Sequence, residues 1–258
     1  MNSFESQLIG TWTLLKKELL RFWRVAFQTV AAPVISGILY LLIFSHVLDG
    51  RLEVYEGVPY MAFLIPGLIM MSLLQNAFSN SSSSLIQAKV MGNIVFLLLT
   101  PLSYLQLYFS LLVASIARGI FVGICIFFIS IFYIKIPIES PLILFLFAFL
   151  GGGLMGSFGI IAGVWAERFD QMAAFGNFVI MPLSMLSGVF YSIHSLPPLW
   201  QKVSHLNPFF YMIDGFRYGF LGKSDGSISV GLIYLTILSI IMWYVAFYLY
   251  KKGYKIKS

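Results

Sequence analysis

Residue types that could carry out catalysis are few in this chain, and their spacing does not support it. Residues 222–224 read Gly-Lys-Ser, like the end of a phosphate-binding loop, but Arg217 stands where such a loop needs a glycine. His46, His194 and His205 have no metal-ligand spacing to one another or to acidic residues. The sequence has no paired carboxylates and no Ser–His arrangement. We therefore predict a chain that is not an enzyme, with no metal site and no cofactor of its own.

Charged residues inside apolar stretches are the remaining candidates for function. Arg118 lies within a long apolar run, and a basic side chain at the bilayer centre costs roughly 2.5–3.5 kcal/mol on insertion scales. Either it faces protein or a water-filled path, or the span begins late and the side chain extends to the cytoplasmic surface. Asp214 and Arg217 lie three residues apart in an aromatic segment, and this spacing predicts a pair along one helix.

The composition indicates which elements position these residues. Charged residues make up 10% of the chain and apolar residues 59%, against roughly 25% and 45–50% in soluble domains. Long stretches almost without charge favour membrane helices over a barrel, whose strands alternate polar and apolar residues. The single Cys125 excludes an intrachain disulfide. The net charge of +6 comes from basic residues near the two ends, which is typical of membrane orientation rather than of nucleic-acid binding.

Six apolar runs are long enough to cross roughly 30 Å of hydrocarbon. We predict an all-α integral membrane protein with six transmembrane helices, at 25–48, 58–78, 104–133, 141–165, 172–191 and 228–250. The first run is too long for the core of a signal peptide and has no convincing cleavage site, so it is expected to remain as an uncleaved anchor.

Basic residues flank the apolar region at both ends of the chain. They are Lys16, Lys17, Arg21 and Arg24 before the first run, and Lys251, Lys252, Lys255 and Lys257 after the last. The first connector, 49–56, is net acidic. By the positive-inside rule both termini are cytoplasmic, as an even number of spans requires. This orientation puts the connector 79–100 inside and the segment 192–222 outside.

The chain is predicted to consist of an N-terminal cytoplasmic amphipathic helix, 1–24, and a six-span domain, 25–258. The apolar stripe of that helix consists of Leu8, Trp12, Leu15, Leu19 and Phe22. Lys17, Arg21 and Arg24 lie on the opposite face. Such a helix lies along the inner membrane surface, with its basic side towards lipid headgroups or towards a cytoplasmic subunit.

Small residues and a serine run mark two further regions. Gly152, Gly156, Gly159 and Gly163 form a bare stripe along the fourth predicted span, where a neighbouring helix of the same subunit or of a second copy can approach closely. Residues 79–84, Ser-Asn-Ser-Ser-Ser-Ser, are expected to break the second span. The short helix that follows is either an interfacial helix or a lever that receives force from a cytoplasmic partner.

The segment before the last span is too apolar for a solvated connector. Asn207 and Pro208 predict the start of a short helix, and Gly222 predicts its end. Its apolar stripe consists of Phe209, Met212, Ile213, Phe216 and Phe220. Irregular backbone at a membrane must be satisfied by protein or a water-filled path. The segment therefore either seals the outer side or shapes the exit of a transport path.

Several short motifs occur in one order along the chain. They include Phe190-Tyr191, Leu-Pro-Pro at 196–198, His-Leu-Asn-Pro at 205–208, Phe-Arg-Tyr-Gly-Phe-Leu-Gly at 216–222, and Pro-Leu-Ser at 101–103. In this order they resemble the ABC-2 family of exporter permeases over essentially the whole chain, and within it the small YadH-like inner-membrane permeases and the nodulation-factor exporters. The resemblance implies a type V ABC exporter fold, with six spans, an N-terminal interfacial helix and short re-entrant helices before the last span.

The resemblance also implies partners. They are two copies of a separate cytoplasmic ABC ATP-binding subunit, which carries the ATP and Mg, a second copy of the chain, and membrane lipids. By position, 84–99 would be the coupling helix, and the candidates for contact with the ATPase are Lys89, Gly92, Asn93, Lys17 and Arg21. Relatives often have acidic residues after the Asn-Ile pair, whereas Val95 and Phe96 stand here. The polar contact would then come from Lys89 or Asn93.

We therefore expect the permease subunit of an ATP-driven exporter in the bacterial inner membrane. It would move a drug, a lipid or a glycan-like substrate outward. The candidates for the transport path or outer gate are Arg118, Phe190, Tyr191, Asn207, Asp214, Arg217 and Tyr218. The alternatives are a secondary, ion-coupled transporter and a non-transporting membrane assembly subunit.

Overall fold

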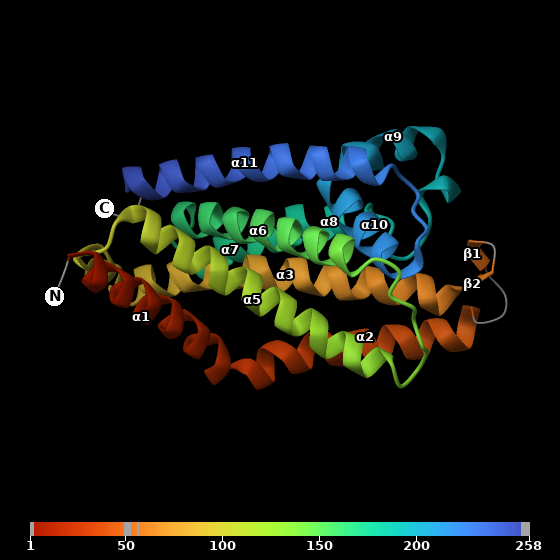
Figure 1. The fold of residues 1–258 in the computed structure, drawn as a ribbon, viewed down its shortest axis with the longest axis horizontal. Helices are drawn as coiled ribbons and strands as arrows, with labels where there is room; N and C mark the ends of the chain where they lie inside the picture. Colours follow the sequence, from red (N-terminus) through yellow and green to blue (C-terminus); the bar gives the residue numbers. More distant parts are fainter. Residues whose placement is uncertain (1–2, 49–52, 56, 254–258) are drawn as a thin grey trace.

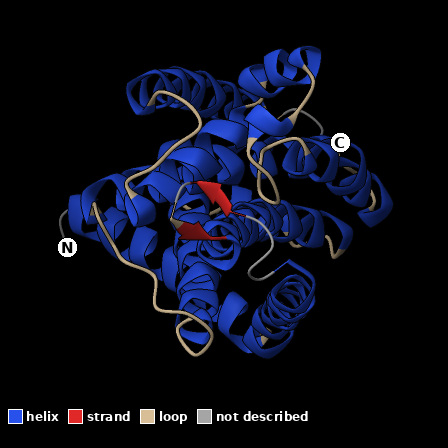
Figure 2. Cartoon of the chain, turned by 90° about the vertical axis from the view of Figure 1, so that its right-hand side faces the viewer, coloured by secondary structure: helices blue, strands red, loops and turns tan. Residues whose placement is uncertain are grey.

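The computed structural model describes residues 3–48, 53–55 and 57–253. Parts of the acidic connector (49–52 and 56) and the basic residues Lys255 and Lys257 lie outside this range. The chain forms an elongated bundle of helices, with the start of the first helix and the end of the last at one end (Figure 1). A small hairpin of strands β1 (Glu53–Tyr55) and β2 (Val58–Pro59) lies at the other end. Viewed from that end, the hairpin lies over the middle of the bundle (Figure 2).

Within the described residues, five helices are long and apolar enough to cross a membrane. They are α2 (Ala26–Leu48), α3 (Tyr60–Val90), α5 (Tyr104–Ser130), α6 (Pro141–Trp165) and α11 (Ile228–Lys252). Each corresponds to a predicted apolar run, and every one except α3 ends close to its predicted boundary. The expected class, an all-α membrane protein, is confirmed.

Helix α3 continues through the serine run, so the prediction that this run breaks the second span is wrong. Ser82 Oγ donates to the carbonyl of Phe78 at 2.8 Å, and Ser83 Oγ donates to that of Asn80 at 3.2 Å. These bonds satisfy the hydroxyls inside the helix. The serines of α3 and Gly159 of α6 are small, so the two helices lie very close together. A Cβ added at Gly159 would collide with α3. The serines therefore form a packing surface rather than a linker.

The coupling segment consequently has other bounds than predicted. Helix α3 ends at Val90, Gly92 turns the chain with φ +72°, and α4 (Ile94–Leu98) follows. A single helix over 84–99 is not present, because the left-handed backbone at Gly92 ends the helical ladder. Helix α5 then starts at a capping box, in which the side chains of Ser103 and Gln106 each accept from the other's backbone N–H.

A fifth predicted run, 172–191, is not confirmed as a span. It is a broken helix made of α7 (Phe169–Phe175), a π-helical turn η1 (Gly176–Ile180) and α8 (Met181–Met185). The π turn comes just before Pro182, which cannot donate a ladder hydrogen bond. The path from 169 to 185 covers about 25 Å at ~1.5 Å per residue, short of the ~30 Å of a bilayer core.

Three short helices follow before the last span, namely η2 (Ile193–Ser195), α9 (Pro198–Leu206) and α10 (Pro208–Leu221). The predicted caps of α10 are confirmed, since Asn207 Oδ1 accepts from the Phe209 N–H at 3.0 Å and Gly222 is left-handed at φ +64°. The five residues predicted for its apolar stripe are all buried. Helix α10 packs against α3 and α6, and therefore closes the bundle core at the end that carries the β1–β2 hairpin.

Helix α1 (Ser3–Arg24) buries only part of its predicted apolar stripe against the rest of the chain. Leu14, Glu18 and Phe22 are buried, whereas Leu8 and Trp12 are 55% and 63% exposed. The helix packs across α5 and also contacts the serine-rich part of α3 through polar side chains. This polar surface draws Glu18 inward, and the contact of the apolar stripe with the membrane stays a prediction.

Candidate functional site

A groove of about 400 Å³ lies between α2, α3 and the broken helix α7–α8. Its polar lining consists of Gln75, Ser79, Ser82, Asn177 and Ser184. Its apolar lining includes Tyr40, Phe78 and the four methionines Met71, Met172, Met181 and Met185. We call it the Gln75 groove. No charged side chain lines it, and methionines let such a surface adapt to different shapes.

One hydroxyl of the Gln75 groove lacks a partner. Ser184 is 1% exposed, and its Oγ makes no hydrogen bond within the described part of the chain. A buried hydroxyl without a partner costs free energy, so a bound polar group at this position would be favourable. The groove can therefore hold a molecule with a large apolar part and a few neutral polar groups.

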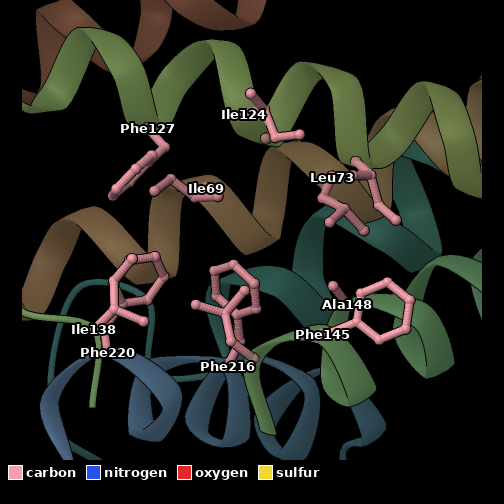
Figure 3. A pocket seen from close by; sticks show the side chains of 12 residues that line it. Ile69, Leu73, Ile124, Phe127, Ile138, Phe145, Ala148, Phe216 and Phe220 are labelled. Atoms are coloured by element: carbon pink, nitrogen blue, oxygen red, sulfur yellow. The ribbon is translucent and has the colours of Figure 1, made fainter. Parts of the chain in front are cut away.

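A second pocket, of about 250 Å³, lies between α3, α5, α6 and α10 (Figure 3). Its lining residues are all apolar, and Figure 3 shows Phe127, Phe216 and Phe220 around it, with Ile69 from α3. Because it offers no hydrogen-bonding side chain, it can accommodate hydrocarbon but cannot recognise a polar substrate. We therefore regard the Gln75 groove as the better candidate for a transport path.

The polar contact between α1 and α3 is centred on a buried carboxylate. Glu18, 1% exposed, accepts from Ser84 Oγ at 2.8 Å and from Arg21 Nε at 3.1 Å. Arg21 Nη2 also donates to the carbonyl of Asn80 at 2.8 Å. Arg21, predicted to contact an ATPase, thus joins α1 to α3, whereas the side chain of Lys17 is 61% exposed.

The other candidates for ATPase contact lie where α3 ends. Lys89 Nζ donates to the last carbonyls of α6, at Val164 and Ala166. It satisfies groups that the end of a helix leaves without partners. Gly92 and Asn93 are exposed in the following turn. Lys89 therefore makes its contacts within the chain. The turn at Gly92 and Asn93 is the part after α3 that is exposed at this end of the bundle.

Arg118 lies in the middle of α5 and is 7% exposed. Its Nε and Nη2 donate to Asn76 Oδ1 of α3 at 3.3 and 3.2 Å, and its guanidinium lies 5.5 Å from the ring centroid of Phe22. The side chain therefore faces protein and does not extend to a surface. It joins three helices, away from the Gln75 groove and from the outer candidates.

Arg217 and Asp214 do not form the predicted pair. Arg217, 1% exposed, donates to the carbonyls of Phe63 and Gly188 at 3.2 and 2.7 Å. Asp214 accepts from the backbone N–H groups of Asp225 and Gly226 at 2.8 and 3.0 Å. The prediction was wrong because partners far along the chain outcompete the neighbour on the helix. Burial raises the pKa of the Asp214 carboxyl to about 6, although Arg217 acts to lower it.

Asp225 is a site residue that the sequence reasoning missed. Its Oδ1 accepts from the hydroxyls of Tyr55 and Ser192, both at 2.8 Å, and its Oδ2 accepts from the Ile193 N–H at 2.9 Å. One carboxylate therefore joins the β1–β2 hairpin, the η2 turn and the loop before α11. The Ser-Asp-Gly sequence at 224–226 was the available signal, because Asp in such turns binds nearby backbone and hydroxyl groups.

The remaining outer candidates have separate roles in packing. The ring of Phe190 lies against Tyr40 and Phe44 of α2, at centroid distances of 5.4 and 5.9 Å. Tyr191 Oη donates to the carbonyl of Met185, and Asn207 Nδ2 to that of Leu183. Tyr218 is half-buried on α10. The structure thus gathers these residues at the hairpin end of the bundle, around the end of the broken helix.

Within the described residues, no three His, Cys, Asp or Glu side chains come together as a metal-binding group. His194 and His205 are exposed, and the ring of His205 lies edge-on to Phe210 at 5.2 Å. The described residues thus form a membrane helix bundle with the neutral Gln75 groove. At the hairpin end the Asp225 carboxylate joins three segments, and at the other end Glu18 and Arg21 join α1 to α3.

Known proteins with similar sequences identify the family of this chain. The model of the family described as "ABC-2 type transporter" matches residues 10–221. The chain is 39% identical to "Inner membrane transport permease YadH" of Escherichia coli (strain K12), over 96% of this chain and 98% of that protein. It is 21% identical to "Nodulation protein J" of Neorhizobium galegae, with 96% and 95% covered. It is 27% identical to "Probable multidrug ABC transporter permease YbhR" of Escherichia coli (strain K12), over 60% of this chain and 42% of that protein. The chain belongs to the ABC-2 type transporter family, as a multi-pass membrane permease.

Proposed function

We propose that this permease exports an amphipathic substrate across the inner membrane, driven by a separate ATP-binding subunit. The observation that carries the proposal is the Gln75 groove, in which neutral polar groups and methionines line one surface between membrane helices. Such a lining suits a molecule that is mostly apolar and carries a few uncharged polar groups, as many drugs and lipids do. Outward direction follows from the resemblance to exporters.

We also propose the arrangement in which the permease works. Both termini are cytoplasmic, the broken helix α7–α8 together with residues 186–191 makes the sixth crossing, and helices α9 and α10 re-enter the outer leaflet. Two copies pair with two ATP-binding subunits. The turn at Gly92 and Asn93, with Lys17 beside it, contacts the ATPase. Arg21 and Glu18 then pass its movement to α3, because they join α1 to that helix.

An ion-coupled transporter has less support from the structure. Such a transporter commonly couples through acidic side chains near mid-membrane, which exchange protons or bind the ion. The five described spans contain no Asp or Glu, and the buried carboxylates of Glu18 and Asp214 lie on α1 and α10. These acids serve as structural acceptors for hydrogen bonds rather than as a relay.

The first test determines whether ATP hydrolysis requires the separate ATP-binding subunit. The purified chain in detergent is expected to hydrolyse no ATP, and hydrolysis is expected only when an ATP-binding subunit is added. Robust hydrolysis by the chain alone would refute the division of labour. In vesicles, a transmembrane ion gradient without ATP should drive no export, which excludes the ion-coupled alternative.

The second test addresses the groove. In a Cys125→Ala background, Asn177→Cys places a thiol on the exposed rim of the Gln75 groove, and Ile240→Cys places one on the exposed face of α11. A bulky maleimide at 177 is expected to block export, whereas the same label at 240 should leave it unchanged. Equal export after both labels would show that the groove is not the path.

A further inference from the structure

A stripe of basic side chains on α1 lines a cavity of about 570 Å³. The cavity is bounded by Lys16, Lys17, Arg21 and Arg24, and by Gln87 of α3. A second cavity, of about 350 Å³, shares Lys17, Arg21, Arg24 and Gln87 with it. These four basic residues recur at helical spacing and lie along one side of α1. Four positively charged side chains therefore lie beside the first cavity, and three of them also line the second.

The positive charge of this cavity is only partly neutralised within the described part of the chain. Glu18 is the one acid among the residues lining the two cavities, and it is 1% exposed. Its Oε2 accepts from Ser84 and Arg21, and its Oε1 lies 3.8 Å from Lys17 Nζ, so this one carboxylate offsets one of the four positive charges. Lys16 and Arg24 are exposed and make no hydrogen bond or ion pair within the described part of the chain. An anion is therefore the complementary ligand.

The residues around the cavity indicate which kind of anion it binds. Arg24 stands just before α2, the first span, which begins at Ala26. Trp12 and Trp23, each 63% exposed, lie three helical turns apart on the edge of α1 next to the basic stripe. Tryptophan is enriched at membrane–water boundaries, and basic clusters that adjoin a span attract anionic lipid headgroups.

The first span continues this surface with exposed apolar residues. Ile35, Leu39 and Ile43 are 52–55% exposed and recur every four residues, so they form one stripe along α2. A lipid whose headgroup occupied the cavity would thus have an apolar surface for its acyl chains. A soluble acidic protein would use the basic residues but neither the exposed tryptophans nor this stripe.

We propose that the cavity is a binding site for an anionic phospholipid, with its phosphate held by Lys16 and Arg24. Arg21 adds its charge from the wall while its N–H groups hold α3. The site stands independently of the proposed direction of transport and of the groove. It would keep α1 at the membrane surface, beside the junction that Glu18 forms with α3.

The proposal is tested by lipid binding to the full chain in detergent, measured by native mass spectrometry. The probes are phosphatidylglycerol and phosphatidylcholine with identical acyl chains. The variants are Lys16→Gln with Arg24→Gln and, as a matched control, Lys251→Gln with Lys252→Gln at the exposed end of α11. Wild type is expected to bind phosphatidylglycerol at least tenfold more tightly than phosphatidylcholine. The first pair should weaken phosphatidylglycerol binding about thirtyfold for its two lost charges, and the control pair less than threefold.

Other outcomes overturn the site. Equal binding of the two lipids by wild type would mean that no headgroup is recognised. An equal loss in the control pair would mean general charge attraction. If phosphatidylglycerol binding is unchanged but the first pair binds the ATP-binding subunit more weakly in phosphatidylcholine nanodiscs, the stripe serves an acidic protein instead. Unchanged thermal unfolding of both pairs serves as the check on folding, because these side chains are exposed.

Discussion

The guanidinium of Arg217 lies over the ring of Phe63, 3.7 Å from its centroid, while Nε donates to the carbonyl of the same residue at 3.2 Å. This contact joins α10 to the first turn of α3 across 154 positions of the chain. Nη2 of Arg217 donates to the Gly188 carbonyl, just after the broken helix. One buried side chain therefore holds three segments together at the hairpin end of the bundle.

Replacing Arg217 by lysine is expected to destabilise the protein by about 2–4 kcal/mol, because an ammonium keeps the charge but loses the planar stack and the fork of donors. Arg217→Gln should cost at least as much, because it also removes the charge. Thermal unfolding in detergent measures the effect, and Arg168→Gln, at an exposed arginine, is the control.

The same Arg217 variants distinguish a seal from a gate at the hairpin end, which we propose to be the outer one. Export and assembly with the ATP-binding subunit are measured in parallel. Loss of both indicates a seal. Normal assembly with lost export indicates a gate and would contradict the structural role argued for this arginine.

Arg118 and Asn76 are expected to show strong coupling in a double-mutant cycle. Asn76→Leu leaves a buried guanidinium without its acceptor, at a cost of about 3–5 kcal/mol. Arg118→Met leaves the Asn76 amide oxygen unsatisfied, at about 1–3 kcal/mol. The double variant should be more stable than the sum of these losses allows. Thermal unfolding of the four proteins gives the coupling free energy, and additive effects would argue against the pair.

Gly159→Ala is expected to disrupt the contact between α6 and α3. A Cβ at this position would overlap Ser81 Oγ and the carbonyl of Phe78, and backbone cannot move aside. Overpacking of this kind costs about 1–3 kcal/mol, read as a lower unfolding temperature. Gly176→Ala is the matched control, because nothing lies within 4 Å of its added Cβ. Equal stability of the two variants would show that α6 can shift away.

The stability of the protein should depend on the protonation of Asp214. Its pKa of about 6 in the folded protein lies above the ordinary 3.8, so protonation favours the folded state. This contribution is complete below about pH 4 and is lost as the pH rises through 6. The free energy of unfolding should fall by about 1 kcal/mol from pH 5 to pH 7 because of this group.

Asp214→Asn provides the comparison, because the amide stays neutral over that range. Thermal unfolding midpoints at pH 5, 6 and 7 are measured for both proteins in the same detergent. The variant should show a smaller fall between pH 5 and pH 7. An identical fall in both proteins would assign the pH dependence to other groups.

The sequence by itself determined the class of the protein, five of its spans and the limits of α10. These features depend on local physics. A run of apolar residues must leave water wherever its neighbours are, and Asn207 and Gly222 end a helix through their own side chain and backbone. The order of short motifs along the sequence likewise indicated the family.

Only the tertiary structure decided how the polar residues are used. The serine run reads as a linker in sequence, yet it is the face on which α1 and α6 pack. Asp214 and Arg217 are neighbours on a helix, yet each binds segments from elsewhere in the chain. A buried polar group takes the partner that satisfies it best, and in a helical membrane bundle that partner often comes from a distant helix or loop, which spacing along the chain does not reveal.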